Sequence, residues 1–318
     1  MKKRRKKGFT LVELLVVIAI IALLMGILMP ALARVRAIAF RMTCGTNLSG
    51  IGKAMLIYAN DYDDELPKAA YGSSTVVTKY LPDWRGGDNH ERAVAYGAPP
   101  QGNATVSSSL YLLIKFAEVT PKSFVCKSDS GTSEFVLSRV KNLPTGDELV
   151  DEFDFGPAFN PSEKTDRGPD MYWSYAYHHP YCLFTLTTSS DPGMAVAADR
   201  NPWLRSISGG PRPAGDWNTF KEGVTNNDSN KQKKGNATAH QEDGQNVLFV
   251  DGHVNFERVS FCGIDEDNIY TPFEVDAWNV PKQNIRIGLQ PSPDDGTVLP
   301  PGSRNDSYLL GNEVGAVP

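Results

Sequence analysis

The most regular pattern in the chain is a long apolar run near its start, behind six consecutive Lys or Arg residues at positions 2–7. From Leu14 to Ala33 the run has about 20 residues, enough for one bilayer crossing at about 1.5 Å per residue. Beyond it, apolar residues recur every three or four positions, which is typical of a helix with one buried face. After a phase shift this second pattern comprises Cys44, Leu48, Ile51, Met55 and Tyr58.

These patterns predict one helix from Phe9 to about Asn60, roughly 78 Å long. Bends are expected at Pro30 and near the glycines Gly45, Gly50 and Gly52, since proline and glycine are common causes of kinks. The segment after the helix, residues 60–67, is dense in Asp and Glu. We interpret it as a solvated loop, with calcium binding as the alternative, because hard cations favour several oxygen ligands.

The middle of the chain shows short strand-like runs between Gly, Pro, Asn and Asp residues, which predict a small antiparallel or mixed sheet. These runs are Ser123 to Cys126, Glu134 to Val140 and Met194 to Ala198. Trp173, Tyr175 and Tyr177 alternate with small residues and form an aromatic stripe. Core packing is the preferred interpretation of this stripe, and an exposed glycan-binding platform is the alternative. Together with the long helix, the pattern predicts an α+β fold.

Two β runs flank Asp251-Gly252, a strong signal for a hairpin with a two-residue type I′ turn. Pairing across that turn would place Val247 opposite Phe256 and Phe249 opposite Val254. By contrast, the stretch from Ser208 to Ala239 and the tail from about Lys282 to Pro318 are polar and rich in Gly or Pro. We expect the first to be a long loop and both to lie largely outside the packed core.

Charge is distributed unevenly along the chain. The formal net charge is −5, and without the six basic residues at positions 2–7 it becomes −5 − 6 = −11. An acidic remainder argues against nucleic-acid binding, which depends on Lys and Arg neutralising phosphates. The basic cluster instead favours retention of the amino end in the cytoplasm, with the rest of the chain outside.

Glu13 lies at the start of the apolar run, where a charged side chain costs roughly 2.5–3.5 kcal/mol within a bilayer. With no partner evident in its own segment, we expect its partner to lie on another copy of the chain. The segment Lys6-Lys7-Gly8-Phe9-Thr10-Leu11-Val12-Glu13 resembles the class III signal of type IV prepilins and type II secretion pseudopilins. A cleavable secretory signal ending near Ala31-Leu32-Ala33 and a plain membrane anchor are the alternatives.

The resemblance implies that a prepilin peptidase cuts after Gly8 and methylates the new terminus at Phe9, and that Pro30 kinks the helix. Cleavage would leave a cationic amine at Phe9, which could pair with Glu13 of a neighbouring subunit in a medium of low dielectric constant. Such a head-to-tail contact does not close on itself and generates a helical filament. The implied partners are the peptidase, other pilin or pseudopilin subunits and an inner-membrane assembly platform.

A second resemblance lies near the carboxyl end. His240 followed by Asp251-Gly252 is similar to the prepilin-processing-associated motif, in which nine residues separate His from Asp-Gly; here ten intervene. A structural role for His240, Asp251, Gly252 and His253 is preferred, with a metal or catalytic cluster that includes Asp243 as the alternative. We likewise expect His178 and His179 to lie on the surface of a loop or strand.

The four cysteines, at positions 44, 126, 182 and 262, allow three pairings. We favour Cys44 with Cys126, because Cys44 lies on the packing face of the helix and Cys126 ends a strand-like run. No catalytic motif such as a nucleophile elbow, a phosphate-binding glycine loop or a zinc-protease helix is evident, which argues against an enzyme.

The predicted organisation is a leader peptide at 1–8, a transmembrane helix at 9–33 and an exposed continuation at 34–60. An α+β exterior domain at 61–281 and an irregular tail at 282–318 follow. The expected function is a non-catalytic filament subunit without a cofactor, held in the bacterial inner membrane by a single pass with its larger domain in the periplasm. The alternative is a membrane-anchored module that binds glycan, a surface or exported cargo.

Overall fold

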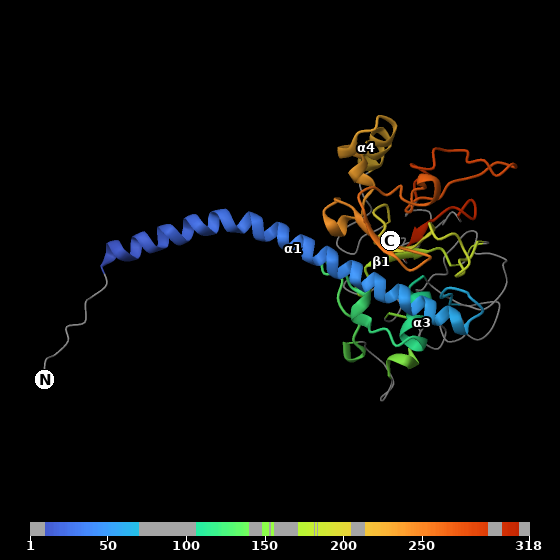
Figure 1. The fold of residues 1–318 in the computed structure, drawn as a ribbon, viewed down its shortest axis with the longest axis horizontal. Helices are drawn as coiled ribbons and strands as arrows, with labels where there is room; N and C mark the ends of the chain where they lie inside the picture. The colour runs from blue at the N-terminus through green and yellow to red at the C-terminus, as the bar shows by residue number, and fades with distance from the viewer. Residues whose placement is uncertain are drawn as a thin grey trace, which may run out of the picture.

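The computed structural model describes residues 10–69, 106–139, 148–152, 154–155, 171–180, 182, 184–204, 214–291 and 301–311. In Figure 1 a long helix, α1, projects from a globular domain that packs against its carboxyl-terminal half. The helix α1 extends over Leu11–Asp61 and therefore measures about 76 Å at 1.5 Å per residue. The predicted helical spine is confirmed, and the fold is α+β.

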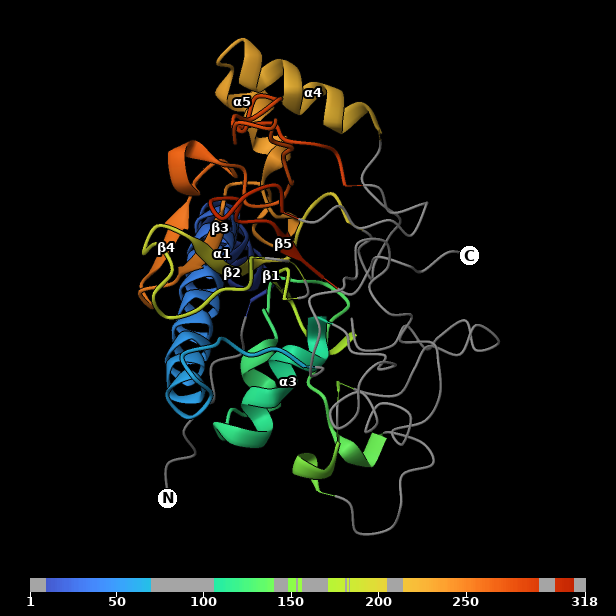
Figure 2. The same cartoon turned by 90° about the vertical axis from the view of Figure 1, so that its right-hand side faces the viewer.

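The domain contains a five-stranded antiparallel sheet in the order β4-β3-β2-β1-β5. The strands are β1 Tyr175–His178, β2 Ala195–Asp199, β3 Gln245–Phe249, β4 Val254–Glu257 and β5 Leu309–Leu310. The remaining α-helices are α3 Val106–Phe116, α4 Ala214–Thr225 and α5 Ser229–Gln232. Figure 2 shows α1 and α4 on different sides of the strands.

The carboxyl-terminal half of α1 packs closely on β3 and β4. A Cβ atom at Gly52 would lie 2.6 Å from Leu248 Cδ1, and one at Gly45 would lie 3.0 Å from the Asn246 side-chain oxygen. Helix and sheet can approach this closely because both positions lack a side chain. The larger of two buried clusters forms here and includes Leu48, Ile51, Met55, Tyr175 and Leu248.

The opposite face of the sheet carries a second buried cluster, beneath α4. Trp217 and Phe220 of α4 pack with Trp203 and Val247, and the rings of Trp203 and Trp217 meet edge to face at 4.9 Å. The expectation of a long loop over Ser208–Ala239 is therefore wrong for the described residues from 214 onward. Apolar residues at positions 217, 220 and 224 share one helical face and bury it against the sheet.

The tail also contributes to the packed core. Tyr308, Leu309 and Leu310 are buried, and β5 pairs with β1 at the edge of the sheet. The expectation that the tail lies outside the core is therefore wrong for this segment. Strand pairing satisfies its backbone groups and removes its leucine side chains from water, which offsets its polar surroundings in the sequence.

The hairpin between β3 and β4 has a longer turn than predicted. The Gly252 amide donates to the Phe249 carbonyl at 2.9 Å, and the Phe249 amide donates to the His253 carbonyl at 3.0 Å. In the turn, Gly252 has a φ of +85°, and Asp251 does not have a positive φ. The loop therefore has three residues, with glycine in the left-handed position, and the predicted two-residue type I′ turn is wrong.

The extra loop residue shifts the register of the hairpin by one. Leu248 lies opposite Val254, and Asn246 lies opposite Phe256. Val254 and Phe256 therefore join Leu248 on the face that α1 covers, not Val247 as predicted, because side chains alternate between faces. Arg41 of α1 stacks over the Phe256 ring at 3.7 Å from its centroid, which is consistent with this placement.

The other local predictions have mixed outcomes. The run ending at Ala198 is confirmed as strand β2, whereas Ser123–Cys126 and the described part of Glu134–Val140 are not strands. The first run overlaps the 3-10 turn Pro121–Phe124, which a proline begins, and the second contains the 3-10 turn Leu137–Arg139. The acidic residues at 61–65 are exposed, as the solvated-loop interpretation expects.

The aromatic stripe is part of the core, as the preferred interpretation expects. Trp173, Tyr175 and Tyr177 are all buried, which contradicts an exposed glycan-binding platform at these residues. The Tyr175 hydroxyl donates to the Cys44 carbonyl at 3.4 Å, and the Tyr177 hydroxyl donates to the Pro67 carbonyl at 2.9 Å. Both hydroxyls therefore find hydrogen-bond acceptors within the core.

Candidate functional site

The start of α1 is fixed by a reciprocal capping box. Thr10 is the N-cap residue, and its hydroxyl oxygen accepts a hydrogen bond from the Glu13 amide at 3.3 Å. In return, Oε2 of Glu13 accepts from the Thr10 amide at 2.8 Å and from its hydroxyl at 2.7 Å. The box satisfies two amides that a helix start would otherwise leave unpaired.

The expectation that Glu13 lacks a partner in its own segment is therefore wrong. The pattern Thr-x-x-Glu before an apolar run is a recognised capping signal, and it was present at Thr10-Leu11-Val12-Glu13. Thr10 is thus a residue of the site that the sequence analysis did not single out. Both hydrogen bonds from Thr10 use the same carboxylate oxygen, and both donors are uncharged. Gly8 and Phe9 lie outside the described residues.

The amino-terminal half of α1 presents apolar side chains to the outside on all sides. Its most apolar 18-residue window has a mean hydropathy of 3.1 and is 0% buried. By length and composition the helix can cross a membrane. Pro30 lies inside α1, which continues through it, although proline removes the hydrogen bond to the carbonyl four residues earlier. The kink at Pro30 stays a prediction.

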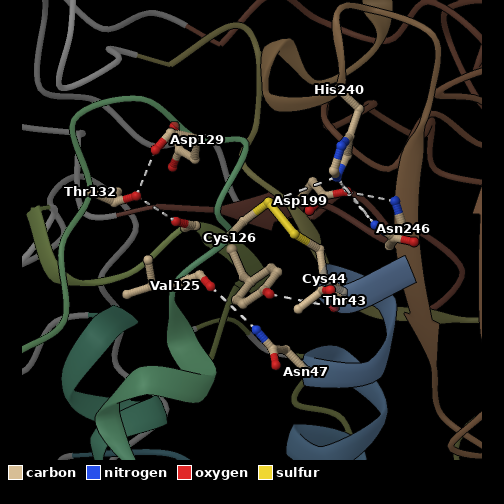
Figure 3. Close-up of a disulfide and its surroundings, with 12 residues drawn as sticks. Thr43, Cys44, Asn47, Val125, Cys126, Asp129, Thr132, Asp199, His240 and Asn246 are labelled. Atoms are coloured by element: carbon tan, nitrogen blue, oxygen red, sulfur yellow. Dashed lines mark hydrogen bonds and ion pairs between the residues drawn. A yellow bond between two sulfur atoms is a disulfide. The ribbon is translucent and has the colours of Figure 1, made fainter. Parts of the chain in front are cut away.

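Farther along α1, a disulfide joins Cys44 to Cys126 with their Cα atoms 5.3 Å apart, the pair favoured from the sequence (Figure 3). It connects the helix to the segment that follows the 3-10 turn Pro121–Phe124. Both sulfurs are buried, and His240 Nε2 lies 3.9 Å from the Cys126 sulfur. Cys182 and Cys262 are free cysteines.

One ring nitrogen of His240 contacts two polar side chains of the sheet. Its Nε2 lies 3.1 Å from Asp199 Oδ2 and 3.3 Å from Asn246 Nδ2. Asn246 also donates to Asp199 Oδ2, through its amide at 2.7 Å and through Nδ2 at 3.1 Å. The histidine of the carboxyl-terminal motif therefore belongs to a buried polar group beside the disulfide.

The other residues of that motif form the exposed tip of the hairpin. Asp251 Oδ1 accepts from the His253 amide at 3.0 Å and contacts the His253 ring, and Gly252 supplies the left-handed turn position. Asp251 and His253 side chains are each 45% exposed, whereas His240 is buried. The alternative interpretation, a metal or catalytic cluster of His240, Asp243, Asp251 and His253, is therefore contradicted, because the buried His240 lies apart from the exposed hairpin tip. Within the described residues, His240 instead lies in a group with Cys44, Cys126 and Asp199, whose side chains are of types that can bind a metal, although the two cysteines here form the disulfide.

His178 and His179 are buried, so the expectation of surface positions is wrong. His178 is in β1, and its Nε2 lies 3.3 Å from the Asp306 carbonyl. Burial lowers the pKa of His178 to about 4 and that of His179 to about 3. Both imidazoles are therefore neutral at physiological pH and act as core residues of the sheet edge.

Comparison with known proteins gives one match. A family model described as the prokaryotic N-terminal methylation motif matches residues 3–29, which include the basic cluster, Gly8, Phe9 and Glu13. No curated protein and no solved structure matches the chain. The matched motif and the long apolar helix that contains most of it indicate membrane anchoring and processing by a prepilin peptidase. The chain therefore carries a type IV prepilin-like leader.

Proposed function

We propose that this protein is a non-catalytic subunit of a helical filament in a type II secretion or type IV pilus-like apparatus. It is cut after Gly8, methylated at Phe9 and assembled through the amino-terminal half of α1. Before assembly it spans the inner membrane once, with its sheet domain in the periplasm. Its partners are the prepilin peptidase, other pilin or pseudopilin subunits and an inner-membrane assembly platform.

The observation that carries this proposal is the division of α1 into two surfaces. The buried residues of the helix begin at Cys44 and continue to Ala59, where they pack against the domain. In contrast, the large apolar residues from Leu11 to Met29 are 44–77% exposed. Such a surface is stable in lipid or against other copies of the same helix, because both remove it from water.

The charges at the start of α1 favour a head-to-tail contact between subunits. Loss of the leader removes six basic residues and creates an amine at Phe9, adjacent to the N-cap. The carboxylate of Glu13 is held in place by Thr10 but receives no positive charge from it. A neighbouring subunit's amine supplies that charge, and each subunit then offers one anion and one cation. This heterologous contact repeats along a filament.

The test is the substitution Glu13→Gln, which keeps an oxygen that can accept from Thr10 and removes the charge. We expect unchanged levels in the membrane and at least about a tenfold loss from the filament fraction, because a lost contact of about 1.4 kcal/mol weakens association tenfold. Immunoblots of sheared filaments and membranes measure both quantities. The control Thr10→Ala weakens the cap but retains the carboxylate, and it should still assemble. Incorporation of Glu13→Gln at the wild-type level would contradict the pairing of charges.

A further inference from the structure

Four side chains that are common metal ligands meet where α1 joins the domain (Figure 3). They are Cys44 on α1, Cys126 after the 3-10 turn Pro121–Phe124, Asp199 at the end of β2, and His240. Their ligand atoms all lie within 4.8 Å of one another, and all four residues are buried. The cluster thus draws together four segments that are far apart in the sequence.

Apart from the two sulfurs, which are bonded to each other in this structure, the spacing of these atoms is close to that of a tetrahedral zinc site. Zn–S bonds of about 2.3 Å and Zn–N or Zn–O bonds of about 2.0–2.1 Å place sulfur and nitrogen about 3.6 Å apart, and nitrogen and oxygen about 3.3 Å apart. The corresponding distance from Cys126 Sγ to His240 Nε2 is 3.9 Å here, and the Asp199 carboxylate lies beside the same nitrogen, with its Oδ2 at 3.1 Å. In such a site the two sulfurs lie about 3.8 Å apart and are not bonded to each other.

Asp199 provides a second, independent observation. Its Oδ1 is buried and has no hydrogen-bond partner among the described residues, whereas Asn246 holds its Oδ2 with two hydrogen bonds. An unpaired buried carboxylate oxygen costs free energy, and a bound cation removes that cost. Asn246 resembles the outer-shell partners that orient the ligands of metal sites.

A groove lies beside one residue of the cluster. A groove of about 750 Å³ lies against His240 between α1 and the loops that contain Lys127 and Gln241. His240 is one of the residues that line this groove. Cys44, Cys126 and Asp199 do not line it, so His240 separates the groove from the rest of the cluster.

We infer that Cys44, Cys126, Asp199 and His240 bind a zinc ion when the two cysteines are reduced. Zinc and the disulfide are then alternative links between α1 and the domain. Newly synthesised chains carry both sulfurs as thiols, and zinc binding releases their two protons as two Zn–S bonds form. Oxidation by a disulfide-donating protein takes two electrons from the thiolates, forms the Cys44–Cys126 bond, converts the donor disulfide to two thiols with uptake of two protons, and releases Zn²⁺.

The experiment uses untagged full-length protein in detergent, freed of metal and either reduced with a phosphine or left oxidised. Each sample is titrated with Zn²⁺ against a chromophoric chelator, and with Co²⁺ as a spectroscopic probe of tetrahedral thiolate coordination. We expect one metal ion per reduced chain, a thiolate-to-cobalt charge-transfer band, and no site in the oxidised chain. An absence of stoichiometric binding by the reduced protein would overturn the inference.

Variants distinguish this site from other ligands on the chain. Asp199→Asn keeps an oxygen that can accept from Asn246, and we expect it to weaken zinc binding by at least about tenfold. The double variant Cys182→Ser, Cys262→Ser removes the two free thiols and should bind as the wild type does. Unchanged binding by Cys44→Ser, or loss of binding in the double variant, would place the metal elsewhere and contradict the assignment.

Discussion

Asp267 and Asp306 are two buried carboxyl groups near the carboxyl end of the described chain. Asp267 Oδ2 accepts from the Ser307 amide at 2.8 Å, and Asp306 Oδ2 accepts from the amides of Gly302 and Phe273 at 2.8 and 3.0 Å. The second oxygen of each has no hydrogen-bond partner within the described residues. Burial raises the pKa of Asp306 to about 7, and burial and the charge of Asp306 raise the pKa of Asp267 well above its ordinary value.

The raised pKa values of this pair predict that the free energy of unfolding falls as the pH rises. Between about 3.8 and about 7 the unfolded chain loses a proton from Asp306 that the folded chain keeps. The free energy of unfolding should therefore decrease by about 1.4 kcal/mol per pH unit for each such proton. We expect the melting temperature of Asp267→Asn to equal that of the wild type near pH 4. At pH 7 it should be higher than that of the wild type, because the amide removes one of the two charges. Thermal melting across this range measures both.

A matched control for this prediction is Asp265→Asn, an exposed neighbour, which should follow the wild-type profile. If the melting temperatures of Asp267→Asn and the wild type differed by the same amount at every pH, the buried pair would not control the pH dependence of stability. This pair is not evident from the sequence, because burial and proximity of two aspartates 39 positions apart (306 − 267) follow from the fold alone.

At the scale of elements, the contact of α1 with the sheet depends on Gly52. A Cβ atom there would lie 2.6 Å from Leu248 Cδ1, whereas one at Gly50 meets nothing within 4 Å. We expect Gly50→Ala to stabilise the protein by up to about 1 kcal/mol through helix propensity. Gly52→Ala should destabilise it relative to Gly50→Ala by about 1–3 kcal/mol, because it overpacks a buried contact.

Melting temperatures of the two alanine variants in detergent test this prediction. The expected order is Gly50→Ala highest, then wild type, then Gly52→Ala. Equal stability of the two variants would show that Leu248 moves aside freely and that the close approach of α1 to β3 is unimportant.

The elements that could be predicted from the sequence are those with strong local signals. The helix α1 and strand β2 follow from hydrophobic periodicity, and the hairpin follows from Asp251-Gly252. Its register did not follow, since the same dipeptide also fits a three-residue loop with glycine in the left-handed position. In α4 the apolar residues at 217, 220 and 224 have helical spacing, but the polar composition of the surrounding segment favoured the prediction of a loop. The edge strand β5 has only two residues and depends on its pairing with β1.

The candidate site, like the fold, could be predicted from the sequence only where the signal is local. The leader signature at Gly8, Phe9 and Glu13 could be read from the sequence because its residues are adjacent. The cluster at Cys44 and Cys126 could be predicted only in part, since Asp199 comes from a different strand and its position depends on the assembled sheet. His240 was noticed, but with partners from its own neighbourhood in the sequence.

At the scale of the whole molecule, the exposed half of α1 and the globular domain are expected to be separable. Removal of residues 1–33 deletes the apolar run but keeps every buried residue of α1, because these begin at Cys44. We expect residues 34–318 to be soluble, monomeric and folded, with the thermal midpoint of the full chain in detergent. Size-exclusion chromatography and melting curves provide the measurement. An aggregated or unfolded fragment would contradict the proposed division.

The central claim is that the protein functions as a processed subunit within a polymer. Intact mass and amino-terminal sequencing of the protein recovered from sheared filaments of its native host test this claim most directly. The account predicts polymeric material whose chains begin at Phe9 and carry one methyl group on the terminal amine. A protein found only as a monomer, or chains that keep residues 1–8, would contradict it.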